Sequence, residues 1–97
     1  MAVKLLLDGA TSTGVSAEVW NPRRSEQKAG IFQVDFSAGV GTVTLEGRLN
    51  PSFPWETIVT IASTDTEHAA IVTMFPNVQA NVTAFTSGVI SAAGDSG

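Results

Sequence analysis

The sequence predicts an all-β protein, namely an antiparallel β-sandwich or barrel-like domain of seven to eight short strands. Threonine, serine, valine and glycine dominate the chain, and no long window keeps apolar residues at helical spacing without an interrupting glycine or proline. Several segments instead alternate apolar with polar residues, as half-buried strands do. Turn-forming residues divide these segments about every eight to twelve residues, which is typical of sandwiches and barrels.

The clearest alternation lies in the middle of the chain. Phe32, Val34 and Phe36 alternate with polar residues and form one predicted strand. In "TVTLEGRL" the predicted inner face holds Val43, Leu45, Gly47 and Leu49, and the predicted outer face holds Thr42, Thr44, Glu46 and Arg48. In "WETIVTIA", Ile58 falls on the face opposite Val59, so we expect this strand to be covered on both faces for part of its length.

Turn residues bound the remaining predicted strands, which are Val3 to Leu7, Val15 to Trp20, Ala69 to Phe75, Val78 to Phe85 and Val89 to Ala93. The link "SAGVG" predicts a tight hairpin whose glycines adopt positive φ. The segment from Met74 to Ala92 predicts a closing hairpin in which Val78, Val82 and Ala84 turn inward and Ser87-Gly88 reverses the chain. Residues 94–97 are expected to form a flexible C-terminal tail.

Length and composition bound the possible functions. With 97 residues, of which 43% are hydrophobic, the chain predicts a single domain spanning residues 1–97. Nine acidic against five basic residues give a net charge of −4, which disfavours nucleic-acid binding. The chain has no cysteine, and no apolar stretch reaches the ~20 residues of a membrane-spanning helix. We therefore expect a soluble protein without an export signal, which stays where it is made or joins an assembly there.

Residues that carry catalysis or bind metals are sparse, and we predict no enzyme activity, metal or cofactor. Asp65, Glu67 and the single histidine, His68, are suitable metal ligands, but a solvated loop is the favoured interpretation. A serine hydrolase would need a G-x-S-x-G elbow, and the sequence has none. Gly39-Val40-Gly41 lacks the third glycine of a dinucleotide-binding loop.

Two segments are candidates for binding a partner. The loop "WNPRRSEQKAG" holds Arg23, Arg24 and Lys28, three of the five basic residues, and would dock on an acidic partner unless it is simply a solvated connection. In "NPSFPWE", Phe53 and Trp55 would fill a partner's pocket or stack on a sugar. The competing interpretation, that these two aromatic residues cap the core, is favoured.

The segments "TVTLEGRLNPSFPWETIVTI" and "MFPNVQANVTAFTSGVISA" resemble small β-sandwich virion proteins of tailed bacteriophages. Capsid decoration proteins are the most similar of these, and the resemblance covers about Gly41 to Ala93. It implies a non-enzymatic protein that is made in the host cytoplasm and lies on the capsid surface of the virion. It also implies a homotrimer that bridges neighbouring major capsid subunits and binds neither nucleic acid nor membrane. Two alternatives stay open: a phage tail or neck component, and a carbohydrate-binding module that stacks sugars on Trp20, Phe53 or Trp55.

Overall fold

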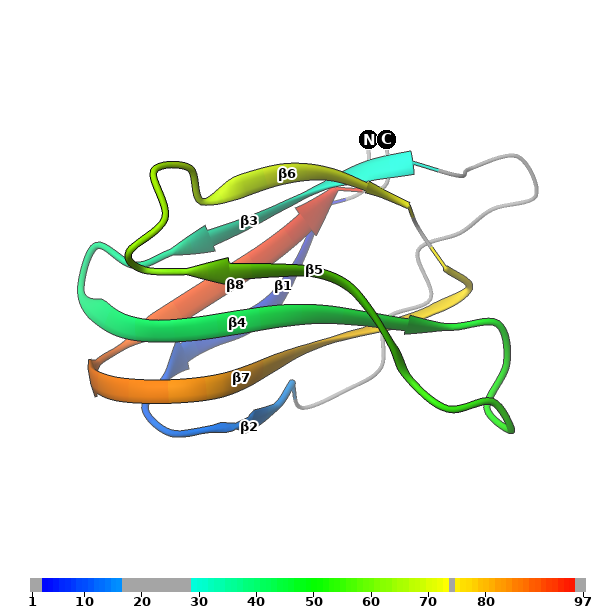
Figure 1. The fold of residues 1–97 in the computed structure, drawn as a ribbon, viewed down its shortest axis with the longest axis horizontal. Coiled ribbons are helices and arrows are strands. Elements are labelled where there is room, and N and C mark those ends of the chain that lie inside the picture. Colours follow the sequence, from blue (N-terminus) through cyan, green and yellow to red (C-terminus); the bar gives the residue numbers. More distant parts are fainter. Residues whose placement is uncertain (1–2, 17–28, 74, 96–97) are drawn as a thin grey trace.

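The computed structural model describes residues 3–16, 29–73 and 75–95, which form eight strands in two sheets (Figure 1). The strands are β1 (Val3–Ala10), β2 (Gly14–Val15), β3 (Ala29–Asp35), β4 (Gly39–Arg48), β5 (Glu56–Ala62), β6 (Ala69–Thr73), β7 (Asn77–Gly88) and β8 (Ile90–Asp95). Every strand pair is antiparallel. The predicted all-β, antiparallel sandwich of seven to eight strands is confirmed.

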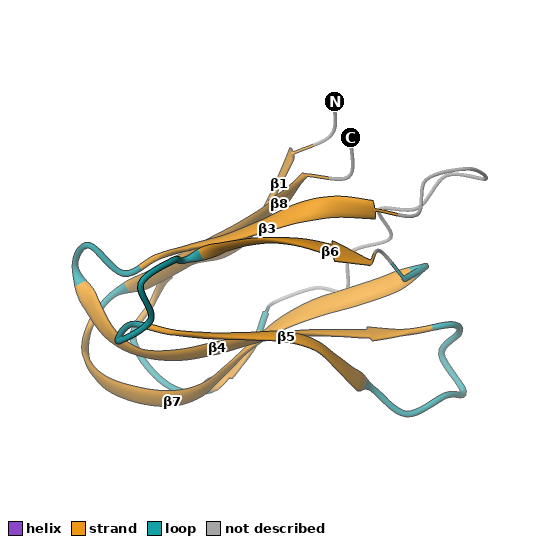
Figure 2. Ribbon diagram, turned by 45° about the horizontal axis from the view of Figure 1, so that its top comes forward, coloured by secondary structure: helices purple, strands orange, loops and turns teal. Residues whose placement is uncertain are grey.

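Each layer of the sandwich contains four strands. Sheet 1 has the order β1-β8-β3-β6, and sheet 2 has the order β2-β7-β4-β5. Figure 2 shows the two sheets as facing layers, with β1, β8, β3 and β6 in one and β4, β5 and β7 in the other. Val3, at the start of β1, pairs with Asp95, at the end of β8, so the two ends of the described chain lie side by side.

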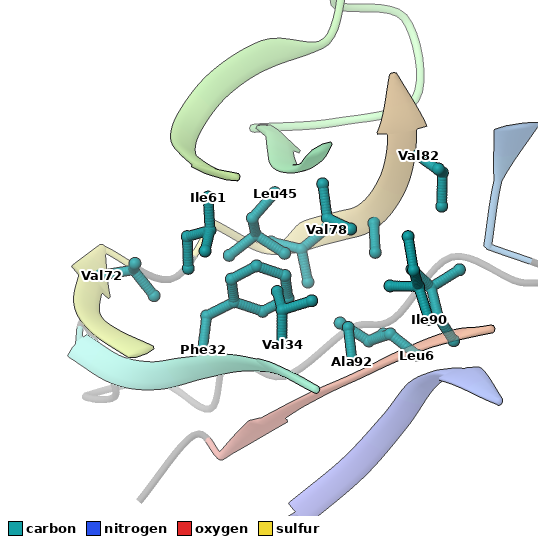
Figure 3. Packing of buried hydrophobic residues seen from close by; sticks show 13 residues of the cluster. Leu6, Phe32, Val34, Leu45, Ile61, Val72, Val78, Val82, Ile90 and Ala92 are labelled. Atoms are coloured by element: carbon teal, nitrogen blue, oxygen red, sulfur yellow. The ribbon is translucent and has the colours of Figure 1, made fainter. Parts of the chain in front are cut away.

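The core lies between the two layers. Phe32 and Val34 of β3 point toward Leu45 and Val78 of the opposite sheet (Figure 3). The buried apolar residues are Leu6, Leu7, Phe32, Val34, Val43, Leu45, Ile61, Val72, Val78, Ala80, Val82, Ile90 and Ala92. Each large side chain of this set contributes about 1.5–3 kcal/mol through removal of apolar surface from water. The alternation around Val43 is confirmed, but Leu49 is exposed, because β4 ends at Arg48.

Two β-bulges change the predicted inward and outward faces. The β4–β5 register shifts between Leu45 and Glu46, and both Ile58 and Val59 therefore pack against the core. The prediction that Ile58 and Val59 lie on opposite faces is wrong. A second shift, in the β4–β7 ladder, pairs Thr42 with Ala84, which is exposed and does not turn inward as expected.

The two predicted hairpins are connections between sheets. β3 and β8 belong to sheet 1, whereas β4 and β7 belong to sheet 2, so neither "SAGVG" nor the Ser87-Gly88 turn joins paired neighbours. Gly88 has φ +80° and reverses the chain as expected, but Gly39 and Gly41 are not among the glycines with positive φ. A side chain at Gly41 would collide with the Ala84 carbonyl and the Ile90 side chain, so glycine is needed there for close packing.

The ends of two predicted strands also differ from expectation. β8 continues through Gly94 and Asp95, which were expected in a flexible tail, and Gly94 pairs with both Lys4 and Phe32. β2 is short, but Ser16 extends its contact with β7, since its backbone N–H donates to the Ala80 carbonyl at 2.7 Å. The rest of the strand predicted to reach Trp20 lies outside the described residues. The described part of the chain contains no helix of the length and apolarity needed to span a membrane.

Candidate interaction surfaces

The basic loop predicted to dock on a partner lies outside the described residues. Arg23, Arg24 and Lys28 all fall in the segment 17–28, as does Trp20. Their role in docking therefore stays a prediction from sequence.

The aromatic segment lies in the turn between β4 and β5. Asn50 organises this turn, since its carbonyl accepts the Phe53 N–H at 3.0 Å and its side chain accepts the Ser52 N–H at 2.9 Å. Phe53 is 48% exposed, so it does not cap the core as favoured from the sequence. Trp55 is half-buried, and the Arg48 guanidinium carbon lies 4.1 Å from the centroid of its ring. Arg48 therefore covers one face of the indole.

The outer face of sheet 2 is polar and its side chains bind one another. Glu46 accepts hydrogen bonds from Gln79 Nε2 at 2.8 Å and from Asn81 Nδ2 at 3.4 Å. The hydroxyls of Thr44 and Thr60, which face each other on β4 and β5, are 3.3 Å apart. Gln79 is almost fully buried beside Glu46. Several polar groups of this face are therefore satisfied within the chain.

The outer face of sheet 1 exposes several large apolar side chains, with polar residues such as Asp95 and Gln33 between them. Val3, Asp95, Ile31 and Ile71 lie in one row across its four strands, because each is the register partner of the next. The next row, derived in the same way, consists of Leu5, Ala93, Gln33 and Ala69. We call the side chains of Val3, Leu5, Ile31 and Ile71, with Ala93 between them, the apolar face.

The large residues of the apolar face are exposed. Leu5 is 53% exposed, Ile31 50% and Ile71 83%, and Val3 is exposed to a similar degree. The small residues of β8 leave shallow hollows between them. Hollows of about 210, 250 and 270 Å³ lie beside Leu5, between Ile31 and Ile71, and beside Val3. Exposed large apolar side chains grouped on one face are a feature of interaction sites on soluble proteins.

Sequence reasoning did not single out the apolar face, although the sequence carries a signal for it. Ile31 precedes the buried Phe32, and Ile71 precedes the buried Val72. Consecutive apolar residues in a strand point to opposite faces, so each pair places one apolar side chain outside. Such pairs also occur in strands covered on both faces, and the sequence alone does not distinguish the two cases.

The residues around His68 maintain the local fold. The Asp65 carboxylate accepts the Ala62 N–H at 2.8 Å and closes the turn after β5. The His68 ring packs edge-on against Phe36, with centroids 4.8 Å apart, and its Nε2 is buried without a hydrogen-bond partner. The described residues contain no group of three or more His, Cys, Asp or Glu side chains placed to hold a metal.

A hollow of about 730 Å³ lies beside His68, at the end of the sandwich where β3 connects to β4. Two of its polar side chains already bind backbone N–H groups. Asp35 accepts the Ser37 N–H at 2.8 Å, and Ser63 Oγ accepts the Gly41 N–H at 3.2 Å. Hydrogen bonding from Ser37, through its side chain and then its backbone, lowers the pKa of Asp35 from its ordinary value of 3.8. These contacts hold the connection between the sheets in place.

Comparisons with known proteins return structural similarity alone. No protein-family model and no curated protein matches the sequence. Among solved structures, a mutant of the carbohydrate-binding module CBM29-2 is 10% identical, with a TM-score of 0.49 over 96% of this chain and 89% of that one. A family 29 carbohydrate-binding module is 11% identical, with a TM-score of 0.48 over 96% of this chain and 86% of that one. A CBM29-2 mutant complexed with mannohexaose is 11% identical, with a TM-score of 0.48 over 96% and 89% of the two chains.

Proposed function

We propose that this chain is a non-enzymatic virion structural protein that decorates and stabilises a bacteriophage capsid by bridging major capsid subunits. The apolar face of sheet 1 is the observation that carries this proposal. Four large aliphatic side chains there contact solvent instead of the core. Burial of these side chains on docking would favour binding by about 25 cal/mol per Å² of apolar surface removed from water.

The shape of the molecule suits this role. Its principal extents are 38 × 26 × 19 Å, so the sandwich is broad relative to its thickness. A specific protein interface needs about 800 Å² per partner, which one broad face of this size accommodates. The resemblance of residues 41–93 to phage virion β-sandwich proteins supports the same assignment. An oligomer of the chain would engage several subunits at once, and linked contacts bind more tightly than any single contact.

The non-enzymatic part of the proposal is supported by what the polar side chains do. The ring of the sole histidine packs on Phe36 and its Nε2 is buried, so this nitrogen does not face a substrate. Asp35 and Asp65 hold turns through backbone N–H groups. These groups make contacts that stabilise the fold, whereas a catalytic residue would have to face a substrate.

One observation favours a second candidate, carbohydrate binding. Phe53 presents an aromatic ring to solvent at the β4–β5 turn, as sugar-stacking residues do. Its neighbour Trp55 is less suited to stacking, because Arg48 lies over its ring. A glycan-binding function would therefore depend on Phe53 and would leave the apolar face without a role.

Binding to undecorated heads of the phage that encodes the chain tests the proposal. Leu5→Lys places a charge on the apolar face, and Val15→Lys is the matched control on sheet 2, because Leu5 and Val15 are 53% and 56% exposed. We expect Leu5→Lys to lose most co-sedimentation with heads and Val15→Lys to retain it. Equal binding by both variants, or binding to tails or glycans that Phe53→Ala abolishes, would overturn the proposal.

A further inference from the structure

The unpaired edge of β6 is built differently from the other outer strands of the two sheets. Protein edges are normally protected by charges, prolines, bulges or short length. β1 has two register shifts, β5 has a bulge and Glu56, and β2 is two residues long. β6, with the sequence AAIVT, has no charge or proline and keeps a regular register with β3 over all five residues. Among the described residues, β3 is its only strand partner.

The alternation of hydrogen-bonded and non-hydrogen-bonded pairs between β3 and β6 identifies which backbone groups of β6 point away from the sheet. Val34 N–H donates to the His68 carbonyl at 2.8 Å, and this pair lies one step beyond the Gln33–Ala69 pair. Hydrogen-bonded and non-hydrogen-bonded pairs alternate along an antiparallel ladder. Ala70 and Val72 therefore direct their N–H and C=O groups to β3, whereas those of Ala69, Ile71 and Thr73 point away from the sheet.

We propose that β6 pairs with β6 of a second copy, antiparallel and about a two-fold axis at Ile71. In this register Ile71 lies opposite Ile71 of the other copy, and Ala69 lies opposite Thr73. The backbone N–H and C=O groups of Ala69, Ile71 and Thr73 point outward. The Ile71–Ile71 pair and the two Ala69–Thr73 pairs therefore each exchange two hydrogen bonds. The two copies of sheet 1 then form one continuous eight-stranded sheet.

The side chains at the edge favour a second copy as the occupant. Two uncharged strands meet without like-charge repulsion, although each chain carries a net charge of −4. Ile71 is 83% exposed, and the pairing places it beside the same residue of the partner, which extends the row of Val3, Ile31 and Ile71 into a second molecule. The contact uses the strand edge and, within the apolar face, involves Ile71 alone, so Val3, Leu5 and Ile31 stay accessible to another partner.

The expected complex is a two-fold dimer, in place of the trimer that the resemblance to decoration proteins implies. Five-residue strands bury little surface, so the dimer belongs to the weak class, with a dissociation constant on the order of micromolar. Sedimentation velocity over a concentration series should show a shift from monomer to dimer. A monomer at all concentrations, or a trimer, would contradict the pairing.

Hydrogen exchange of the unmodified chain tests the register without any mutation. We expect the amides of Ala69, Ile71 and Thr73 to become protected as protein concentration rises. The amides of Ala70 and Val72, already bonded to β3, should show unchanged protection. Protection that is independent of concentration at all five amides would overturn the proposal.

Substitutions at Ile71 separate the backbone contact from the side chain. Ile71→Pro removes the outward N–H and spares the ladder to β3, so it should abolish the dimer, whereas Ile71→Thr keeps the N–H and should retain most of it. The chain has no cysteine, so Ile71→Cys should form a disulfide-linked dimer on oxidation, and Val15→Cys, on sheet 2, should not. Equal cross-linking of the two cysteine variants would count against the pairing even if Ile71→Pro failed to fold.

Discussion

Ile31 and Ile71 lie directly opposite each other on β3 and β6, with their side chains 50% and 83% exposed on the outer face of sheet 1. A cross-strand pair of β-branched residues stabilises a sheet modestly, because each side chain covers part of the other. Here most of the apolar surface is still in contact with water. The pair therefore adds little to the stability of the single chain, and its surface is available for contact with other molecules.

Replacing both residues should have little effect on folding. We predict that Ile31→Thr combined with Ile71→Thr lowers the free energy of unfolding by less than ~1 kcal/mol, since threonine keeps the β-branch and no core contact is lost. Leu45→Ala, at a fully buried position, should cost about 2–5 kcal/mol. Urea unfolding measures both. A loss in the double variant as large as in Leu45→Ala would show that the pair belongs to the core.

The connection from β7 to β8 should be more sensitive to substitution of its positive-φ glycine than the register irregularity of β1, which contains Gly9. Gly88 has φ +80°, and a Cβ there would collide with the Ala38 carbonyl oxygen, whereas Gly9 has φ +69° with open space around it. We predict that Gly9→Ala costs about 1–2 kcal/mol from backbone strain alone and that Gly88→Ala costs more, on the order of 3 kcal/mol or above. Thermal unfolding compares the two variants. Similar losses would mean that the arch between the sheets relaxes around an added methyl group.

Glu46 holds two amide side chains on the outer face of sheet 2. Glu46→Ala leaves the buried Gln79 amide without its acceptor, so we expect the free energy of unfolding to fall by about 1–3 kcal/mol. Glu46→Gln keeps one acceptor oxygen and should lose less. Glu56→Ala, at an exposed carboxylate on β5, is the control and should stay within about 0.5 kcal/mol of the parent. An equal effect at Glu46 and Glu56 would refute the role assigned to this hydrogen bond.

The hydrogen bonds from Ser37 predict a pH dependence at Asp35. Because they lower the pKa of the folded state below 3.8, their stabilising effect is present above the unfolded pKa and is lost as pH falls through the lowered folded pKa. NMR titration of the Asp35 carboxyl should give a value below 3.8. Ser37→Ala should raise that pKa toward its ordinary value, since the largest cause of the shift is the Ser37 side chain. An unchanged titration in Ser37→Ala would contradict this assignment.

Local patterns in the sequence predicted much of the secondary structure. The alternation around Phe32 and Val43 is a local property of a pleated strand, and it correctly identified buried residues. The assignment of strands to sheets was not predictable in the same way, because the connections at Gly39 and Gly88 cross between layers through contacts distant in sequence. The bulge beside Ile58 likewise arises from pairing with β4, so alternation along β5 alone placed that residue on the wrong face.

The candidate site was harder to predict from the sequence than the fold. Sequence segments rich in arginine and aromatic residues, such as the predicted loop with Arg23 and Arg24, are prominent by composition. An apolar face, in contrast, is assembled from one or two residues on each of several strands. Val3, Ile31 and Ile71 are more than twenty residues apart in sequence, and only strand register brings them into one row. That register depends on packing of the whole sandwich.

Cryo-electron microscopy of heads reconstituted with this protein tests the central claim most directly. The account predicts density in which the outer face of β1, β8, β3 and β6 lies against the major capsid protein, with Leu5 and Ile31 at the contact. Sheet 1 facing solvent, with the chain attached through sheet 2 or the Phe53 turn, would contradict it, as would heads that carry no added density.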